Sequence, residues 1–333
     1  MTGRTLDGMT KSPLLSLPGA VPAEGPDEGV AAHYGDLFRE QRTLADGTGF
    51  VDLSHRGVVT VSGADRLSWL HLLLTQHVEQ LPPNQATEAL ILSAHGHIEH
   101  ALYLVDDGAT TWMHVEPGTQ ESLLAYLESM KFFYRVEAED ATDRYAVVHL
   151  PAGSITQVPQ EWAVRETAYG RDVFVPRDRL EEWAERSGPP IGVLAHEALR
   201  IEAHRPRIGF ETDHRTIPHE VGWLDTAVHL NKGCYRGQET VARVHNLGRP
   251  PRRLVFLHLD GSEVRLPAHG APVRIAEEGP DGELGRAIGF ITSSARHWEL
   301  GPIALALVKR NTPERATLLA EDTAAAQETV VAP

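Results

Sequence analysis

The sequence contains a single cysteine, Cys234, in 333 residues. One cysteine excludes a disulfide within the chain and is typical of proteins kept in a reducing cytosol, so we expect a cytoplasmic location. It also falls short of the roughly four thiolates that normally hold an iron–sulfur cluster, which leaves only a cluster shared between two copies. No apolar run approaches the ~20 residues of a membrane-spanning helix, and we expect no membrane partner.

Four familiar catalytic motifs are also absent. The sequence has no His-Glu-x-x-His, no phosphate-binding P-loop, no Gly-x-Gly-x-x-Gly and no Gly-x-Ser-x-Gly. Hydrolase, kinase and dehydrogenase functions therefore lack their usual support in the sequence.

Positive charge is scarce relative to negative charge. The chain has 31 Lys and Arg against 46 Asp and Glu, which gives a formal net charge of -15 and a pI of about 5.6. Nucleic acids and anionic membranes need an electropositive surface, so this balance argues against nucleic acid as a partner. The length is typical of two or three domains with ample buried core.

The order of the predicted elements is typical of an α+β protein. Residues 1–29 are rich in Gly, Pro, Thr and Ser, and we predict a disordered arm there. Residues 30–249 follow the order strand, helix, several strands, helix and strand, and the pattern then restarts near Arg144. Within this region we predict that residues 132–136 form a strand.

The last part of the chain has a different character. Short predicted strands at evenly spaced positions, separated by Gly, Pro and Asp turns, indicate a small β-barrel over residues 250–322. The Ala-rich segment 323–333 is predicted to be a disordered tail.

The segment Asn231–Thr240 is the one that we predict to be a functional loop. Gly233 and Gly237 leave the backbone free to turn tightly. Residues 238–246 have the spacing of a short helix, which a following glycine and proline end. The cysteine therefore lies just before the N-terminus of a predicted helix.

That position favours the thiolate form of Cys234. The unsatisfied N–H groups and the positive end of the helix dipole lie nearby, and Lys232 and Arg236 add positive charge. We predict that Cys234 is a partly exposed, working thiol. The alternative is that it fills a gap in the core, since free cysteines are among the most buried residues.

Positive charge is concentrated after this loop. Six cations fall within 22 residues: Lys232, Arg236, Arg243, Arg249, Arg252 and Arg253. Such a run is usually a solvated face with salt bridges to nearby acids. The functional interpretation is capture of an anionic ligand, for which a carboxylate or an RNA phosphate would serve.

Three histidines, His95, His97 and His100, fall within six residues. His95 and His97 would share one face of a strand, but a third facing ligand is not evident. Histidines in loops are commonly only solvated, and we predict no metal ion here.

The run Lys232-Gly-Cys-Tyr-Arg-Gly-Gln-Glu239 resembles the signature of the YgfZ family, and the likeness extends from about Tyr34 to Arg310. These proteins are relatives of the glycine-cleavage T-protein, an aminomethyltransferase. The resemblance implies a T-protein-like, three-lobed arrangement, with a second lobe over roughly residues 52–140 inserted in the first. It also implies tetrahydrofolate, or a one-carbon derivative, as the cofactor.

The resemblance assigns roles to residues outside the loop. The run Arg200-Ile-Glu202-Ala resembles a T-protein segment whose glutamate contacts the pterin ring, although His204 stands where glycine is usual. Glu99 matches a catalytic carboxylate of the T-protein, but a second carboxylate there is replaced by His100. We expect six residues to contact the folate: Glu99, Arg200, Glu202, Lys232, Tyr235 and Arg236.

The function implied is that of a tetrahydrofolate-binding accessory protein that supports assembly or repair of iron–sulfur enzymes, with Cys234 as its thiol. Its partners would be reduced folate and iron–sulfur client or assembly proteins. The alternatives are a folate-dependent aminomethyl or methyl transferase and a folate-linked partner in RNA modification. The replacement at His100 argues against simple aminomethyl transfer.

Overall fold

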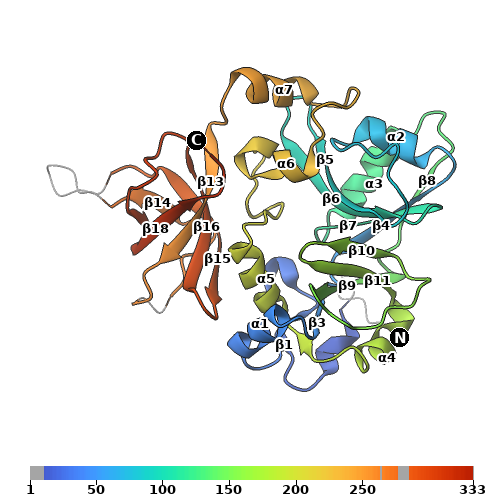
Figure 1. Ribbon diagram of the computed structural model, residues 1–333, viewed down its shortest axis with the longest axis horizontal. Helices are drawn as coiled ribbons and strands as arrows, with labels where there is room; N and C mark the ends of the chain where they lie inside the picture. Colours follow the sequence, from blue (N-terminus) through green and yellow to red (C-terminus); the bar gives the residue numbers. More distant parts are fainter. Residues whose placement is uncertain (1–10, 263–264, 277–284, 333) are drawn as a thin grey trace. The chain divides into compact units, whose positions relative to one another are not determined.

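The computed structural model describes residues 11–262, 265–276 and 285–332 (Figure 1). The chain divides into two compact units. The first unit is Met1–Ile91 with His100–His196, and the second is Leu92–Glu99 with Glu197–Pro333. Within the described ranges, no helix is both long and apolar enough to cross a membrane.

One five-stranded sheet forms the base of the first unit. Its strands, in spatial order, are β10 (Val164–Thr167), β11 (Gly170–Pro176), β9 (Tyr145–Pro151), β3 (Phe50–Asp52) and β12 (Pro190–Ile191). Only the β12–β3 pair is parallel among these four pairings. The sheet buries Phe50, Val148 and Val173 against Leu180 and Trp183 of α4 (Leu180–Ala184). The short helices α1 (Leu37–Ala45) and η3 (Arg177–Arg179) also belong to this unit.

A second five-stranded sheet is formed by residues 57–140. In spatial order its strands are β5 (Ala86–Leu92), β6 (Ile98–Asp106), β7 (Thr110–Val115), β4 (Gly57–Ser62) and β8 (Glu137–Asp140). The helices α2 (Arg66–Leu73) and α3 (Gln120–Ser129) pack on it through Trp69, Leu70 and Leu123. The tip of the β5–β6 hairpin, Leu92–Glu99, is part of the second unit.

The second unit contains the C-terminal barrel. Its described strands close in the order β13 (Arg252–Leu259), β16 (Gly301–Lys309), β15 (Gly289–His297), β14 (Pro272–Ile275), β17 (Leu318–Ala320) and β18 (Thr323–Thr329). Alternate residues such as Val255, Leu257 and Ala306 fill its core. The α+β class and the small C-terminal barrel are thereby confirmed. The rest of this unit contains α5 (Val193–Glu202) in part, η4 (Pro218–Glu220), α6 (Trp223–Ala227) and α7 (Gln238–Leu247).

The predicted disordered ends are wrong wherever the structure describes them. In the N-terminal arm, η1 (Pro13–Ser16) places Leu14 in the core of the first sheet, and β1 (Val21–Pro22) pairs with β2 (Ala31–His33). A single turn of 3-10 helix, η2 (Gly25–Asp27), lies between them. The physical reason is that one buried leucine and a pairing partner suffice to order a Gly- and Pro-rich segment. Residues 1–10 lie outside the described residues.

The C-terminal tail is similarly ordered. β18 pairs with both β13 and β17 and so closes the barrel, which therefore extends past residue 322. The side chain of Ala325 lies in the barrel core, so a small residue of this segment helps to fill the interior.

The strand predicted at residues 132–136 is also wrong. Phe132 has a φ of +43°, which a strand does not accommodate, and the Phe133 side chain is fully exposed. The strand begins instead at Glu137, where β8 pairs with β4. Phenylalanine favours strands in general, but here the residues that meet a neighbouring strand are the polar ones that follow.

Candidate functional site

The cysteine loop lies between α6 and α7 in the second unit. The thiol of Cys234 is exposed, whereas a cysteine that only fills a core gap would be buried. Gly237 is the N-cap of α7 and has a φ of +82°, a left-handed conformation that glycine adopts without strain. The chain thus turns sharply three residues after the thiol and starts a helix whose first N–H groups face the loop.

Two glycines hold this loop against the β5–β6 turn. A Cβ on Gly237 would lie 2.5 Å from the carbonyl oxygen of Ser93 and 3.0 Å from the Cα of Gly96. A Cβ on Gly96, whose φ is +80°, would lie 2.8 Å from the Cβ of Thr240. The two backbones therefore approach more closely than any side chain would allow. This contact brings the histidine-rich turn and the cysteine loop into one site.

An ion pair joins the same two segments. The guanidinium of Arg236 donates to the carboxylate of Glu99 over 2.8 Å, although the residues are 137 positions apart in the sequence. Both side chains remain partly exposed. Such an exposed pair contributes little to the stability of the fold. It does reduce the net positive charge near the loop, because the carboxylate of Glu99 offsets the charge of Arg236.

Lys232 and Tyr235 hold the loop from inside. Both residues are 8% exposed, and the Lys232 ammonium lies 5.2 Å from the centre of the Tyr235 ring, within cation–π range. Burial raises the pKa of the Tyr235 hydroxyl to about 12, so the phenol is neutral at pH 7. The amide of Gln238 also donates to the carbonyl of Lys232 over 3.5 Å. Lys232 therefore packs as part of the loop rather than projecting from it.

Arg200 has a different role from the predicted ligand contact. Its guanidinium is buried and forms ion pairs of 2.9 Å with both Glu197 and Glu211. It also donates to the hydroxyl of Ser293 on β15 over 2.8 Å. A buried arginine needs such partners, and here they tie the end of α5 to the barrel. The guanidinium is therefore committed to structure.

Glu202 lies at the C-terminal end of α5, where its side chain is 42% exposed. Its carboxylate is 3.3 Å from the Nε2 of His297, but the alignment does not make a hydrogen bond. The next residue but one, His204, has a φ of +55°, and its ring packs on Phe256 with centroids 4.8 Å apart. Glycine adopts this left-handed conformation without strain, and here the position is occupied by histidine.

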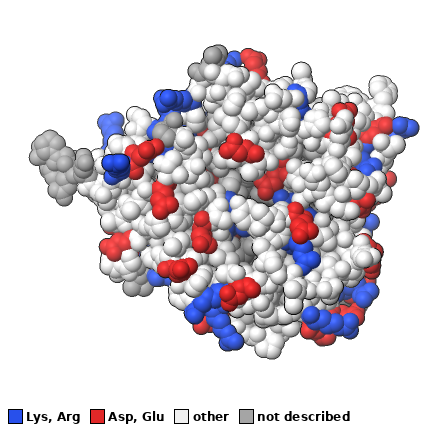
Figure 2. Space-filling model, in the orientation of Figure 1, with Lys and Arg blue, Asp and Glu red and all other residues white. Residues whose placement is uncertain are grey.

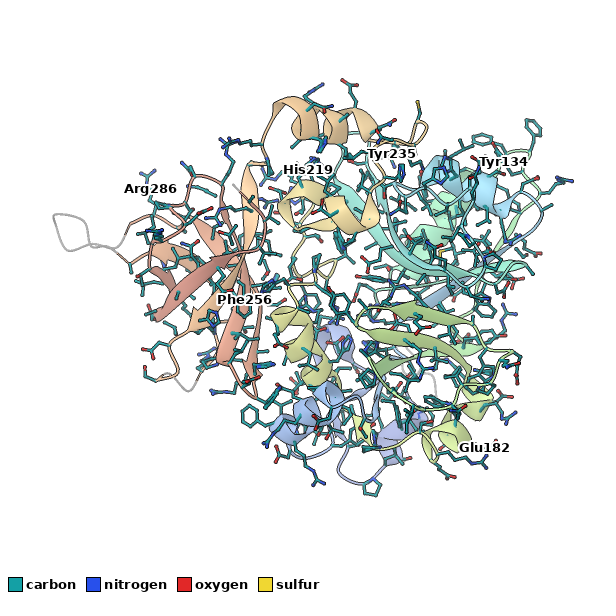
Figure 3. The ribbon with its side chains drawn as sticks, viewed as in Figure 1. Tyr134, Glu182, His219, Tyr235, Phe256 and Arg286 are labelled. Carbon is teal, nitrogen blue, oxygen red and sulfur yellow. The ribbon has the colours of Figure 1, made fainter. Side chains whose placement is uncertain are left out.

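Sequence reasoning missed His219, in η4. Its side chain is buried, yet neither ring nitrogen has a hydrogen-bond partner among the described residues. Burial lowers the pKa of His219 to about 4, so the ring is neutral at pH 7. The segment that carries it packs against α7 (Figure 3 labels His219 and Tyr235). No local pattern marks this histidine among 18 in the chain.

The cationic run does not form one face. Arg252 is held by Asp213 at 2.6 Å and by Glu220 at 2.8 Å, and Arg253 is fully buried. Arg243 pairs with Glu239 one turn earlier on α7. On the face shown in Figure 2, blue and red side chains are interspersed. The run is thus largely structural, which weakens its interpretation as a phosphate-binding surface.

The three histidines of the turn do not bring their donor atoms together within the part of the chain that is described. The rings of His95 and His97 have centroids 6.1 Å apart and are tilted, and His95 is exposed. The hydroxyl of Ser93 instead accepts from both backbone N–H groups, over 3.2 Å and 3.1 Å, and shapes the turn.

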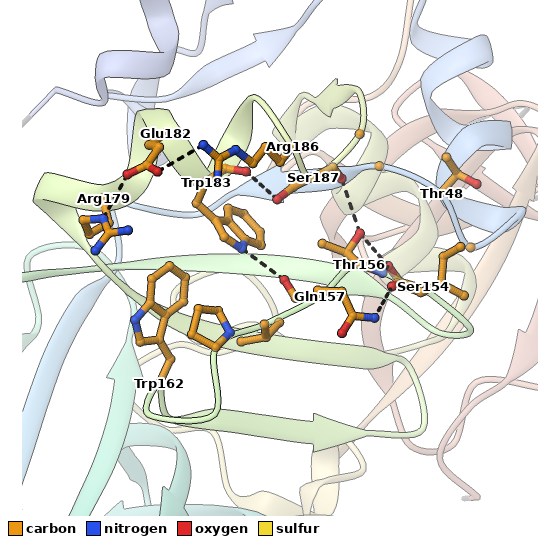
Figure 4. A pocket seen from close by; sticks show the side chains of 16 residues that line it. Thr48, Ser154, Thr156, Gln157, Trp162, Arg179, Glu182, Trp183, Arg186 and Ser187 are labelled. Atoms are coloured by element: carbon orange, nitrogen blue, oxygen red, sulfur yellow. Dashed lines mark hydrogen bonds and ion pairs between the residues drawn. The ribbon is translucent and has the colours of Figure 1, made fainter.

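A separate pocket of about 770 Å³ lies in the first unit (Figure 4). Trp162 and Trp183 line it with ring centroids 6.2 Å apart, and none of the predicted site residues reaches it. Its charged rim is already paired, because Glu182 binds both Arg179 and Arg186. This pocket is therefore separate from the residues predicted to form the site at the cysteine loop.

Residues 31–155 match the family model described as the GCVT N-terminal domain. An aminomethyltransferase of Herpetosiphon aurantiacus is 24% identical over 331 residues, which cover 87% of this chain and 90% of that protein. An aminomethyltransferase of Rubrobacter xylanophilus is 27% identical over 316 residues, covering 85% and 82% respectively.

A solved structure shows the same fold. The glycine cleavage system aminomethyltransferase T from Bartonella henselae aligns with a TM-score of 0.78 at 18% sequence identity. The alignment covers 96% of this chain and 95% of that one. The predicted T-protein relationship is thus confirmed at the level of the fold, while the finer YgfZ resemblance stays a prediction. The chain has a T-protein-like fold, and its residues 31–155 carry a match to the GCVT N-terminal domain.

Proposed function

We propose that this protein binds a reduced folate and acts, through Cys234, as an accessory protein in the assembly or repair of iron–sulfur enzymes in the cytoplasm. The observation that carries the proposal is the exposed thiol, held in a glycine loop whose backbone is fixed against the 93–97 turn. A thiol presented in this way can reach a partner protein or a sulfur species. The cluster would be cargo, because one cysteine per chain cannot hold it alone.

Two residues of the second unit fit a folate. The exposed carboxylate of Glu202 can accept two parallel N–H bonds, as the amino group and adjacent ring N–H of a pterin would offer. The two buried ring nitrogens of His219 have no hydrogen-bond partner among the described residues, and a bound ligand could supply one. Arg200 does not fit, because its guanidinium is already committed. A bound reduced folate would supply one-carbon carrier chemistry.

The pair between Glu99 and Arg236 favours an accessory role over aminomethyl transfer. A carboxylate that stabilises charge on a reacting amine must face the substrate, but Glu99 is bonded to Arg236 over 2.8 Å. The residue beside it is His100 rather than a second carboxylate. The same pair would keep Arg236 in place beside the thiol.

Folate binding can be measured by calorimetric titration with 5-formyltetrahydrofolate. We expect micromolar binding by the intact protein and a loss of about 1.5–3 kcal/mol, roughly 10- to 100-fold in Kd, for Glu202→Ala, because hydrogen bonds to a charged group are lost. Glu128→Ala removes the same charge from an exposed site on α3, outside the cysteine loop, and should bind like the unchanged protein. Equal affinities for all three proteins would remove Glu202 from the site, and absence of binding would reject the folate proposal.

The thiol can be tested separately by reactivation of an oxygen-damaged iron–sulfur dehydratase. We expect the intact protein with reduced folate to raise the recovered activity several-fold, and Cys234→Ser to lose that gain while binding folate normally. The exposed position means that serine can replace cysteine without changing the packing. Full reactivation by Cys234→Ser would show that the thiol does not take part.

A folate-dependent aminomethyl transferase remains the second candidate, and the likeness to two aminomethyltransferases favours it. The partly exposed carboxylate of Glu99 would then leave Arg236 when substrate binds. Turnover of an aminomethyl donor with tetrahydrofolate, abolished in Glu99→Gln, would select this candidate over the accessory role.

A further inference from the structure

Three metal-binding side chains gather at the end of α2, in the first unit. His71 is in the last turn of that helix, and His77 and Glu79 follow on the loop to β5. One ligand atom from each side chain lies within 4.8 Å of the other two. The two imidazole rings meet edge to face, with centroids 4.6 Å apart. We propose that His71, His77 and Glu79 bind a zinc ion.

The backbone that carries these ligands is fixed at two points. Thr75 is fully buried, its N–H donates to the carbonyl of Leu90 over 3.0 Å, and its hydroxyl accepts from the N–H of Leu90 over 2.8 Å. Val78 is also fully buried, in the core of the second sheet. His77 and Glu79 are the two neighbours of Val78, so their Cα positions are held while their side chains point away from the core.

The side chains need only small movements to reach a metal. Zinc bonds of about 2.0–2.2 Å in a tetrahedral arrangement place neighbouring ligand atoms roughly 3.4 Å apart. Atoms that lie within 4.8 Å of one another therefore need to move by at most about 1 Å each. His77 is only partly buried and Glu79 is exposed, so both can rotate toward the buried ring of His71.

Metal binding would change a hydrogen bond that His71 accepts. The backbone N–H of Glu79 donates to Nδ1 of His71 over 3.4 Å. A metal on Nδ1 would displace this N–H directly. A metal on Nε2 would leave the ring proton on Nδ1, which could then no longer accept the hydrogen bond. In either case the loss is small, because a bond of that length is at the weak end of the range.

The ligand set selects the metal. Two imidazoles and one carboxylate suit zinc and related transition metals, whereas Mg²⁺ and Ca²⁺ need oxygen ligands. Three protein ligands leave one tetrahedral position for water, as in zinc sites that remain open to a further ligand. The exposed side of Glu79 is where that water would reach the ion. The site belongs to the first unit, whereas the cysteine loop belongs to the second, so it does not depend on the proposed folate function.

The test is titration of the chelator-treated protein with Zn²⁺ in competition with a chromophoric chelator, and with Co²⁺ followed by its visible absorption. We expect one tight equivalent per chain and the strong Co²⁺ absorption of a four-coordinate site. His77→Ala and Glu79→Gln should each weaken binding by roughly 100-fold, since even the loss of an outer-shell partner typically weakens a site 10- to 100-fold. These variants are chosen because both side chains lie outside the core.

His95→Ala is the matched control. It removes an exposed histidine from the other histidine-rich segment and should leave the tight equivalent unchanged. Circular dichroism of each variant without metal checks that the fold is kept. Zinc binding that is equal in His77→Ala and the unchanged protein, or lost in His95→Ala, would overturn the proposal, and so would the absence of any stoichiometric binding.

Discussion

Replacing Gly237 with alanine should destabilise the second unit by about 2–5 kcal/mol and detach the cysteine loop from the 93–97 turn. Two effects add. An alanine held at a φ of +82° costs roughly 1–2 kcal/mol, and forcing an extra carbon into a packed site typically costs about 1–3 kcal/mol. The new Cβ would lie 2.5 Å from the carbonyl of Ser93, which is backbone and cannot rotate away.

Gly233→Ala provides the control four residues earlier. A Cβ at Gly233 would meet no atom within 4 Å, and its backbone is not in the left-handed region. We expect its free energy of unfolding, measured in urea, to stay within about 0.5 kcal/mol of that of the unchanged protein. Hydrogen exchange of the α7 amides, measured beside urea unfolding, would show whether the damage in Gly237→Ala begins at this helix. Equal stability of the two variants would mean that the close contact with Ser93 does not exist.

Glu211→Ala should destabilise the protein by about 3–5 kcal/mol, because it leaves a buried arginine without one of its two carboxylate partners. Glu211 is fully buried, pairs with Arg200 and accepts hydrogen bonds from the hydroxyls of Thr292 and Ser293. The backbone N–H of Arg207 also donates to it over 2.8 Å. A single side chain thus joins the end of α5, the segment after it and strand β15.

Urea unfolding of Glu211→Ala should be compared with Glu239→Ala, in which the lost carboxylate is exposed and only its i,i+4 pair with Arg243 is broken. That control should change stability by about 0.5 kcal/mol or less. The comparison also tests the structural role of Arg200. If Glu211→Ala were as stable as the control, the guanidinium would not depend on this partner, and the interpretation of Arg200 as a ligand contact would regain support.

Much of the cysteine loop could be predicted from the sequence because its signals are local. Glycine at position 237 permits the left-handed turn that starts α7, and Gly248 follows the end of that helix. The barrel was predictable for a similar reason, since short alternating strands separated by turn residues need no distant partner to be recognised.

Positions of charged groups could not be predicted in this way. Glu99 and Arg236 were each expected at the site, but only the close approach of Gly96 and Gly237 makes them an ion pair. Arg200 was expected to face a ligand, yet Glu197, Glu211 and Ser293 surround it. The charge of a side chain is visible in the sequence, whereas its partner is fixed by which segments the fold brings together.

The sequence by itself determined the α+β class, the C-terminal barrel and the place of the single thiol before a helix, because periodicity, turn residues and composition act over a few neighbouring positions. Only the tertiary structure decided that residues 11–29 and β18 are ordered, since Leu14 and β18 gain their stability from distant strands. It likewise decided that His219 is buried with no hydrogen-bond partner among the described residues, and that His71, His77 and Glu79 converge. Burial and convergence depend on packing between elements, which no local pattern encodes.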